Sequence, residues 1–347
     1  MMIRMKKIGF ILFLAMAFCL KGNAQDDAQF TLFPWATSYY NAGGIGEQSN
    51  TLCFTLMYDN KYVGWHDSYG TRMDTVGGKT GPQDFFLSIE SYHKKLHGAI
   101  GLTFISDQIG FYQNIGVKLG YAYKLRIGGG HLGIGVQASL FNQTINKDGF
   151  DPLQDGDPLL AQLSKSTMDL DFSLGLMYKC DQWYAGVGVT QLAAPLDKNQ
   201  ALRLSGEHGS TRCAQMYFHG GYTWIVPANP NWEVLPQALV KTDFHTATWE
   251  VMALARYNGV YWGGLGYRFQ DAVSLLFGAR PFYNSSNVYL KGLEAGLSYG
   301  ITANKLGYRV HRSFGDVEVM IRYCFDIYKP EVFSGYGSSR SIYKNWY

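Results

Sequence analysis

The chain has 347 residues, a net charge of +3, 41 glycines and a 16% share of aromatic side chains, which equals its share of charged ones. A soluble domain usually carries about 25% charged residues. This composition therefore favours a membrane β-barrel, in which one face of each strand meets lipid and aromatic girdles mark both interfaces. No basic cluster accompanies the small positive charge, and we expect no nucleic-acid partner.

Residues 1–24 predict a signal peptide. Positive charge at the start precedes an apolar run from Ile8 to Leu20, and Gly22-Asn23-Ala24 forms a small-x-small cleavage site. The apolar run is too short for a spanning helix, which needs about 20 residues. No later stretch has 18 consecutive apolar residues. A secreted soluble protein or a barrel remains, because only helices and closed barrels satisfy every backbone group in lipid.

Beyond an N-terminal segment, residues 25–49, apolar and polar side chains alternate with the period of two that indicates strands. From Met168, for example, Phe172 and Leu174 share one face, while Asp171 and Ser173 share the other. Strands of about ten residues suit a tilted crossing of the membrane. The alternation predicts fourteen strands, with 61–68 as an alternative extra one, at 50–59, 84–93, 97–106, 113–125, 131–142, 168–179, 182–192, 213–226, 232–241, 247–257, 260–270, 272–281, 291–301 and 315–327.

Connections between these strands alternate between short and long. The short set is 94–96, 126–130, 180–181, 227–231 and 258–259, with 282–290 as an exception, and the long loops are 60–83, 143–167, 193–212 and 302–314. Outer-membrane barrels have short periplasmic turns and long external loops. We therefore expect a barrel over 50–327 with both chain ends in the periplasm. Residues 25–49 and the tail 328–347 would then be periplasmic segments outside the barrel.

No pattern in the sequence predicts catalysis. None of the histidines sits in a nucleophile–base motif. His219 shares a strand face with Tyr217 and Gln215, which indicates a hydrogen-bond network in the lumen rather than an active site. The glycines at 128–130 lack the Lys-Ser/Thr that follows in a phosphate loop. We expect no enzyme activity, no cofactor and no metal.

Partner contacts are expected in the external loops and the tail. The acidic loop 146–158 has two further interpretations, calcium ligation by close carboxylates and solvated turns. Loops 193–212 and 302–314 lie on the same predicted side. The tail either docks a periplasmic partner or the barrel, or is disordered. The candidate partner-binding residues are Phe150, Asp151, Asp155 and Asp157 in the loop and Tyr336 and Trp346 in the tail.

Four cysteines follow the signal peptide, and their spacing matches no zinc motif. Buried thiols are one interpretation. Barrel closure sets the first strand against the last, so Cys53 and Cys324 fall at one seam near the periplasmic strand ends. A disulfide between them, formed in an oxidising periplasm, is our hypothesis. Cys180 and Cys213 are expected at opposite membrane faces.

Several segments, taken in order along the chain, resemble one protein family. They are Gln25–Phe30, Tyr39–Gly43, Trp232–Lys241, Tyr261–Arg268, Asp271–Ala272, Gly296–Tyr299 and Gly315–Val319. Together they resemble the PorP/SprF family, outer-membrane proteins of the type IX secretion system in the Bacteroidetes. The chain departs from the family in lacking its prolines in the first two segments. It also has Asp316 and Val317 where the family has Ser-His.

The resemblance implies a non-enzymatic role in the secretion and surface anchoring of cargo proteins with C-terminal sorting domains, including adhesins of gliding motility. It implies partners among periplasmic ring components and a peptidoglycan-binding lipoprotein, besides the lipid bilayer. The alternative is an outer-membrane pore or hydrophobic-substrate channel, since about fourteen strands enclose a wider lumen than eight do. Large inward-facing residues, among them Met177, Met252, Leu254 and Met320, favour a filled lumen.

Overall fold

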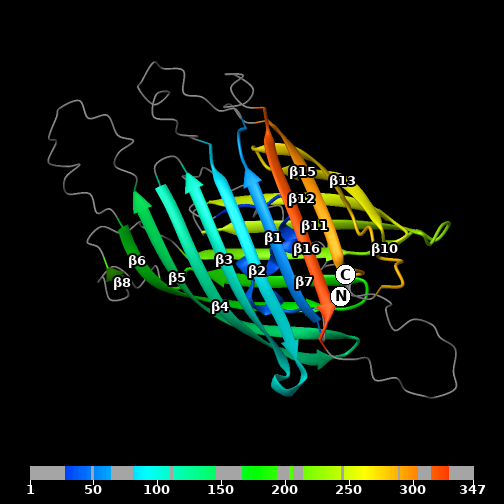
Figure 1. Ribbon diagram of the computed structural model, residues 1–347, viewed down its shortest axis with the longest axis horizontal. Helices are drawn as coiled ribbons and strands as arrows, with labels where there is room; N and C mark the ends of the chain where they lie inside the picture. Colours follow the sequence, from blue (N-terminus) through cyan, green and yellow to red (C-terminus); the bar gives the residue numbers. More distant parts are fainter. Residues whose placement is uncertain are drawn as a thin grey trace, which may run out of the picture.

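The structure is a closed antiparallel β-barrel of fourteen strands (Figure 1). The computed structural model describes residues 28–47, 51–63, 81–109, 112–145, 166–193, 203–205, 214–243, 246–287, 290–303 and 314–327. The barrel strands are β1 (Thr51–Asn60), β2 (Gln83–His93), β3 (Gly98–Ile109), β4 (Tyr112–Ile127), β5 (Gly130–Ile145), β6 (Ser166–Lys179), β7 (Trp183–Thr190), β9 (Gln215–Tyr222), β11 (Trp232–Thr242), β12 (Ala247–Tyr257), β13 (Tyr261–Arg268), β14 (Ala272–Ala279), β15 (Leu293–Thr302) and β16 (Asp316–Asp326).

Each strand pairs with its neighbours along the chain, and β1 pairs with β16 to close the ring. The register at this seam runs from Thr51 opposite Asp326 to Asn60 opposite Val317. Closure gives each described strand of the ring a partner on both sides, which is the condition for a sheet to cross a bilayer.

Two short strands stand apart from this ring. β10 (Trp224–Ile225) continues the line of β9 and pairs with β11. The two are separated at Thr223, whose backbone N–H donates to the carbonyl oxygen of Gln182 (2.7 Å). Off the ring, β8 (Arg203–Ser205) pairs with β6. The predicted strand 213–226 is therefore interrupted.

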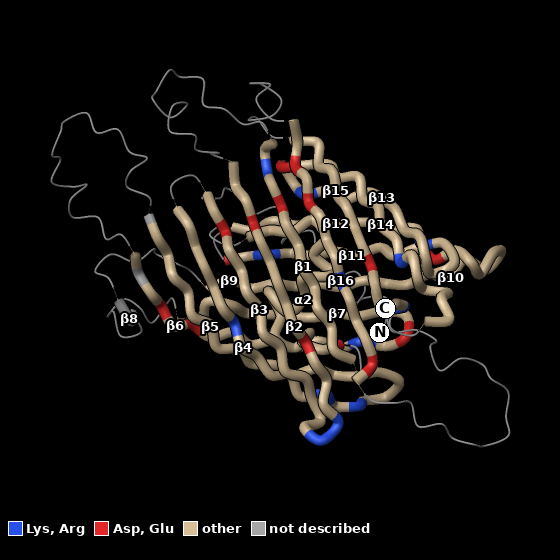
Figure 2. The backbone as a smooth tube through the Cα atoms, viewed as in Figure 1, with Lys and Arg blue, Asp and Glu red and all other residues tan. Residues whose placement is uncertain are grey.

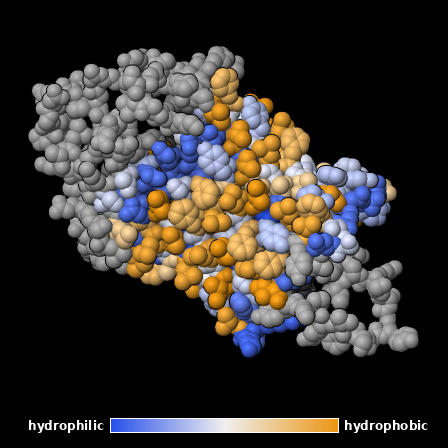
Figure 3. All heavy atoms as spheres, in the orientation of Figure 1, coloured by the Kyte–Doolittle hydropathy of each residue, from blue (hydrophilic) through white to orange (hydrophobic). Residues whose placement is uncertain are grey.

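Side chains alternate between the lumen and the outer surface, as the sequence predicts. In β6, Asp171, Ser173 and Met177 are buried, while Phe172 and Leu174 are exposed. Hydrophobic residues form a broad belt over the outer face of the barrel (Figure 3). Burying this belt in hydrocarbon removes it from water, which is the main driving force for the location of the protein.

The fourteen predicted strands are confirmed, with ends displaced by a few residues. The alternative strand at 61–68 is described only through Val63, and 61–63 lie outside any strand. Within the described ranges, the helices are all too short or too polar to cross a membrane.

The N-terminal segment, residues 28–47, lies inside the ring of strands, where Figure 2 places α2. It forms three single turns, namely η1 (Phe33–Trp35), α2 (Thr37–Tyr40) and η2 (Ala42–Gly44). Pro34 in the first turn suits a helix start, because the missing N–H has no helical partner there. We call residues 28–47 the plug.

Candidate functional site

The plug fills the lumen with apolar side chains. Leu32, Phe33 and Ile45 are at most 1% exposed. The sequence analysis predicts residues 25–49 to be a periplasmic segment outside the barrel. This prediction is wrong for residues 28–47, which lie inside the barrel. The physical reason is that these apolar groups leave water only if they pack against the inner wall.

Glycines in the barrel wall allow the plug backbone to approach closely. Gly133 and Gly135 of β5 and Gly175 of β6 face η2. A Cβ at Gly135 would lie 2.1 Å from the carbonyl carbon of Ala42, and one at Gly175 would lie 2.0 Å from Oδ1 of Asn41. Ordinary contacts of a Cβ are 3.4–4 Å. Only glycine therefore permits this separation between wall and plug.

Wall side chains satisfy backbone carbonyls of the plug. Lys118 of β4 donates from Nζ to the carbonyl oxygen of Tyr39 (2.8 Å), and Gln137 of β5 donates from Nε2 to that of Ser38 (3.0 Å). The Lys118 ammonium also lies 4.1 Å from the ring centroid of Tyr39. Single helical turns leave most of their backbone groups without intrahelical partners. These bonds therefore supply what the plug lacks and fix its orientation.

Asn41 and His219 form a polar centre between plug and wall. Nδ2 of Asn41 lies 2.7 Å from Nε2 of His219. The rings of Tyr40 and Tyr217 stack beside them with centroids 5.5 Å apart. His219, Tyr217 and Gln215 are all buried, so the prediction that they face the lumen is confirmed, and His219 takes part in a polar contact there.

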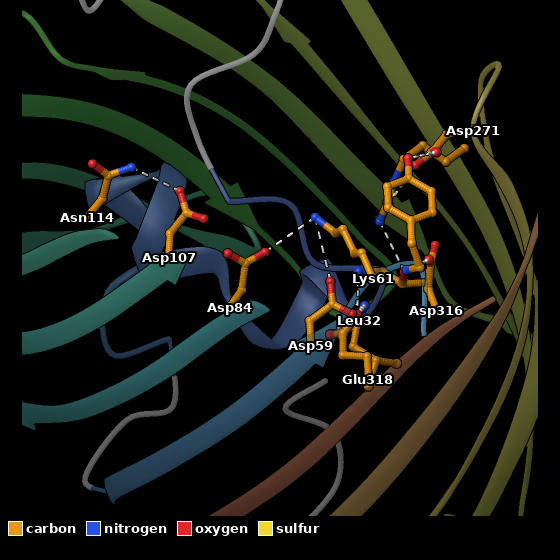
Figure 4. Close-up of polar contacts among 12 residues, drawn as sticks. Leu32, Asp59, Lys61, Asp84, Asp107, Asn114, Asp271, Asp316 and Glu318 are labelled. Atoms are coloured by element: carbon orange, nitrogen blue, oxygen red, sulfur yellow. Dashed lines mark hydrogen bonds and ion pairs between the residues drawn. The ribbon is translucent and has the colours of Figure 1, made fainter. Parts of the chain in front are cut away.

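Four carboxylates follow one another across neighbouring strands near the long-loop end (Figure 4). Glu318 lies opposite Asp59, Asp59 opposite Asp84, and Asp84 opposite Asp107. All four are at most 4% exposed. Nζ of Lys61 lies 3.3 Å from Oδ2 of Asp84 and 3.6 Å from Oδ2 of Asp59. Burial alone would lower the pKa of Lys61, but these two carboxylates outweigh it and raise that pKa above its usual range.

Glu318 also anchors the beginning of the plug. Its Oε2 accepts a hydrogen bond from the backbone N–H of Thr31 (2.6 Å), and its Oε1 accepts one from that of Leu32 (3.2 Å). Arg268 donates from Nη2 to Oγ1 of Thr31 (3.0 Å) and lies 3.1 Å from Glu250 through Nε. Hydrogen bonds to charged groups are roughly twice as strong as neutral ones. The plug is therefore fastened at its start as well as along its length.

Glu47 fastens the other end of the plug. Its Oε2 lies 2.7 Å from Nζ of Lys179, at the end of β6. Burial alone would raise the pKa of the Glu47 carboxyl, but the ammoniums of Lys179 and Lys124 outweigh it and hold that pKa below its usual range. The plug thus runs the length of the lumen, from the acidic row to the short-turn end.

The two cysteines predicted at the seam lie directly opposite each other. Cys53 of β1 and Cys324 of β16 have their Cα atoms 4.1 Å apart, and the structure joins their sulfurs in a disulfide. Cys180 is a free thiol beside the β6–β7 turn. Cys213 falls outside the described residues.

The predicted partner-binding residues fall outside the part of the chain that the structure describes, and so does the acidic loop 146–158. They are Phe150, Asp151, Asp155, Asp157, Tyr336 and Trp346. Their role stays a prediction. Within the described ranges, no cluster of three or more His, Cys, Asp or Glu side chains is arranged to hold a metal ion.

Comparison with known families identifies the type of barrel. The model of a family described as "Type IX secretion system membrane protein PorP/SprF" matches residues 22–323. The chain belongs to the PorP/SprF family. The match takes in the plug and nearly the whole ring of this PorP/SprF protein, and its location is the outer membrane. No curated protein matches it.

Several solved outer-membrane barrels are similar to this PorP/SprF protein at low sequence identity. The CymD monoaromatic hydrocarbon channel is 11% identical with a TM-score of 0.50, covering 88% of this chain and 95% of that one. The Ralstonia pickettii toluene transporter TbuX is 11% identical with a TM-score of 0.49, covering 84% and 94%. Omp33 of Acinetobacter baumannii is 9% identical with a TM-score of 0.41, covering 80% and 100%. At 11% identity the likeness to CymD concerns the fold alone.

Proposed function

We propose that this protein supports the secretion and surface anchoring of cargo proteins that carry C-terminal sorting domains. The observation that carries this proposal is the family match over residues 22–323. In the same proposal, cargo contacts the long loops outside, and periplasmic ring components and a peptidoglycan-binding lipoprotein contact the short-turn end and the tail.

The filled lumen supports this role over that of a pore. The plug contacts the wall by glycine packing, by hydrogen bonds and by ion pairs from one end of the barrel to the other. A solute crossing the barrel would have to displace these contacts, whereas an anchor needs no open path. Met177, Met252, Leu254 and Met320 are at most 4% exposed and add to the filling.

The test is a mild-detergent pull-down of the tagged full-length protein from its native outer membrane, followed by mass spectrometry. We expect a large surface protein with a C-terminal sorting domain, together with periplasmic ring components. A tagged barrel of unrelated function from the same cells is the control. Recovery of the barrel alone, combined with ion conduction in a planar bilayer, would overturn the proposal in favour of the pore.

Two variants test which partner each predicted set of binding residues contacts, the cargo outside or the periplasmic components inside. Alanine at Asp151, Asp155 and Asp157 should reduce recovery of the cargo and leave the ring components in place. Alanine at Tyr336 and Trp346 should do the reverse. Equal recovery of both partners from both variants would contradict the assignment of these residues.

A further inference from the structure

A cavity of about 100 Å³ lies inside the barrel at its short-turn end. Trp35 of the plug stacks on Trp262 of β13 at one side of it, with ring centroids 4.8 Å apart and planes at 23°. Its other walls come from the ends of strands between β6 and β16. The volume admits a group the size of a side chain, and the surrounding strands separate it from lipid.

Four cations line this cavity, and three of them have a carboxylate partner. Lys179 pairs with Glu47 (2.7 Å), and Arg280 lies 3.3 Å from Glu294 through Nε. The third pair is made by Arg256 and Glu233, with Nε and Oε2 2.6 Å apart. These pairs balance the charge around most of the cavity.

The fourth cation, Arg322, has no carboxylate partner among the residues that the structure describes. Its Nε donates to Sγ of Cys324 (3.4 Å). Glu294 lies opposite it in the β15–β16 register, but that carboxylate accepts from Nε1 of Trp262 (2.9 Å) and pairs with Arg280. A half-buried guanidinium favours a carboxylate, since its planar fork matches the two oxygens.

We propose that Arg322 binds the carboxylate of an acidic side chain on a partner's peptide segment, which enters the cavity from the short-turn end. This rests on the proposed function, because the partner is taken to be a periplasmic component of the secretion system. The aromatic pair contacts the aliphatic part of the bound side chain, and Arg322 supplies the one cation of the cavity lining whose charge no described carboxylate balances.

Binding is measured on full-length protein in zwitterionic nanodiscs by ligand-observed NMR titration. The probe is a blocked pentapeptide of four glycines around one central glutamate, and its glutamine counterpart is the control. We expect the glutamate peptide to bind at least about tenfold more tightly than the glutamine peptide, as for a charge-assisted hydrogen-bond pair. Equal binding of the two peptides overturns the proposal.

Three substitutions then test the residue. Arg322→Gln should abolish the preference for glutamate, and Arg322→Lys should retain part of it. Arg126→Gln changes an exposed arginine at the same end that does not line the cavity, and it should leave the preference unchanged. Heat-modifiable migration in gels verifies that each barrel is folded. A preference for the glutamate peptide that persists in Arg322→Gln overturns the proposal. Loss of peptide binding in nanodiscs of anionic lipid also overturns it, because a lipid headgroup would then be the ligand of the cavity.

The pull-down separates this site from the proposed function. If Arg322→Gln loses the glutamate preference and also recovers fewer periplasmic components, both stand. If the wild-type barrel recovers no secretion component but still prefers glutamate through Arg322, the site stands and the proposed function fails. If partners co-purify while the peptides bind equally, the function stands and the site is refuted.

Discussion

Adding one methyl group to the barrel wall should loosen the plug. In Gly135→Ala, the new Cβ would lie 2.1 Å from the carbonyl carbon of Ala42, where an ordinary contact begins at 3.4 Å. The plug must then retreat by about 1.3 Å, the difference between these distances, and overpacking of this kind typically costs about 1–3 kcal/mol. Such a cost shifts the equilibrium between docked and undocked plug by about 5-fold to 150-fold. Gly175→Ala, at 2.0 Å from Asn41, should act in the same direction.

Hydrogen–deuterium exchange with mass spectrometry measures this shift directly, because local opening sets the exchange rate of protected amides. Plug peptides should exchange faster by the factor given above, while peptides from β1 and β16 stay protected. Gly129→Ala is the matched control, since nothing lies within 4 Å of its new Cβ. Unchanged plug exchange in Gly135→Ala would refute the close-packing argument. Faster exchange throughout the barrel would mean that the glycine supports the ring instead.

Three further predictions concern the seam, the orientation and the pH response. Because of the disulfide between Cys53 and Cys324, denatured, unreduced protein should expose two thiols fewer than reduced protein, and equal thiol counts would exclude the disulfide. Removing the disulfide should lower the free energy of unfolding by about 2–4 kcal/mol. In a Cys213→Ser background, Cys180 should react with a bulky polyethylene-glycol maleimide only after the outer membrane is permeabilised. Labelling of that variant in intact cells would reverse the predicted orientation. The pKa of Glu47 is lower in the folded protein than its usual value of 4.5. The pairing of Glu47 with Lys179 therefore stabilises the plug fully at pH values above 4.5, and this stabilisation is lost as the pH falls through the lower pKa of the folded state. Protection of plug amides, measured relative to the intrinsic exchange rate at each pH, should therefore fall at acid pH in the wild type. Glu47→Gln, which is already loosened at neutral pH, should lack this acid step.

The ring of strands was predictable because lipid imposes a strict condition on each strand. An outward residue such as Leu174 must be apolar, and an inward one such as Ser173 need not be, so the period of two survives along every strand. Interruptions inside a strand carry no such signal. Thr223, which follows the last residue of β9, fits the alternation of its neighbours. The register with β11 is the same on both sides of the gap, which falls opposite Leu235 and Pro236, and the proline has no N–H to donate.

The plug was not predictable from its own residues. Phe33, Trp35 and Tyr39 are apolar or amphipathic groups without a period, and such a segment suits a lumen, a partner or an interface equally well. The signal lay in the wall instead. Gly135 and Gly175 occupy inward-facing positions on adjacent strands. Because they have no side chains, the inner face of the barrel there leaves space for the backbone of another segment. Register between strands is needed to see this, and the alternation alone does not provide it.

The course of the plug constrains how this barrel communicates between its two ends. One chain segment contacts Glu318 beside the acidic row at the long-loop end, and the same segment reaches Glu47 and the cavity of Arg322 at the short-turn end. If a ligand at one end binds one plug position more tightly than another, it changes the affinity of a ligand at the other end. The second ligand then changes the affinity of the first by the same free energy. Under the proposed function, cargo outside and a periplasmic partner inside would be coupled in this way if both prefer the same plug position, without any solute passing through the lumen. Arg322→Gln offers the measure of this coupling: it should change recovery of the external cargo only if the plug transmits between the ends.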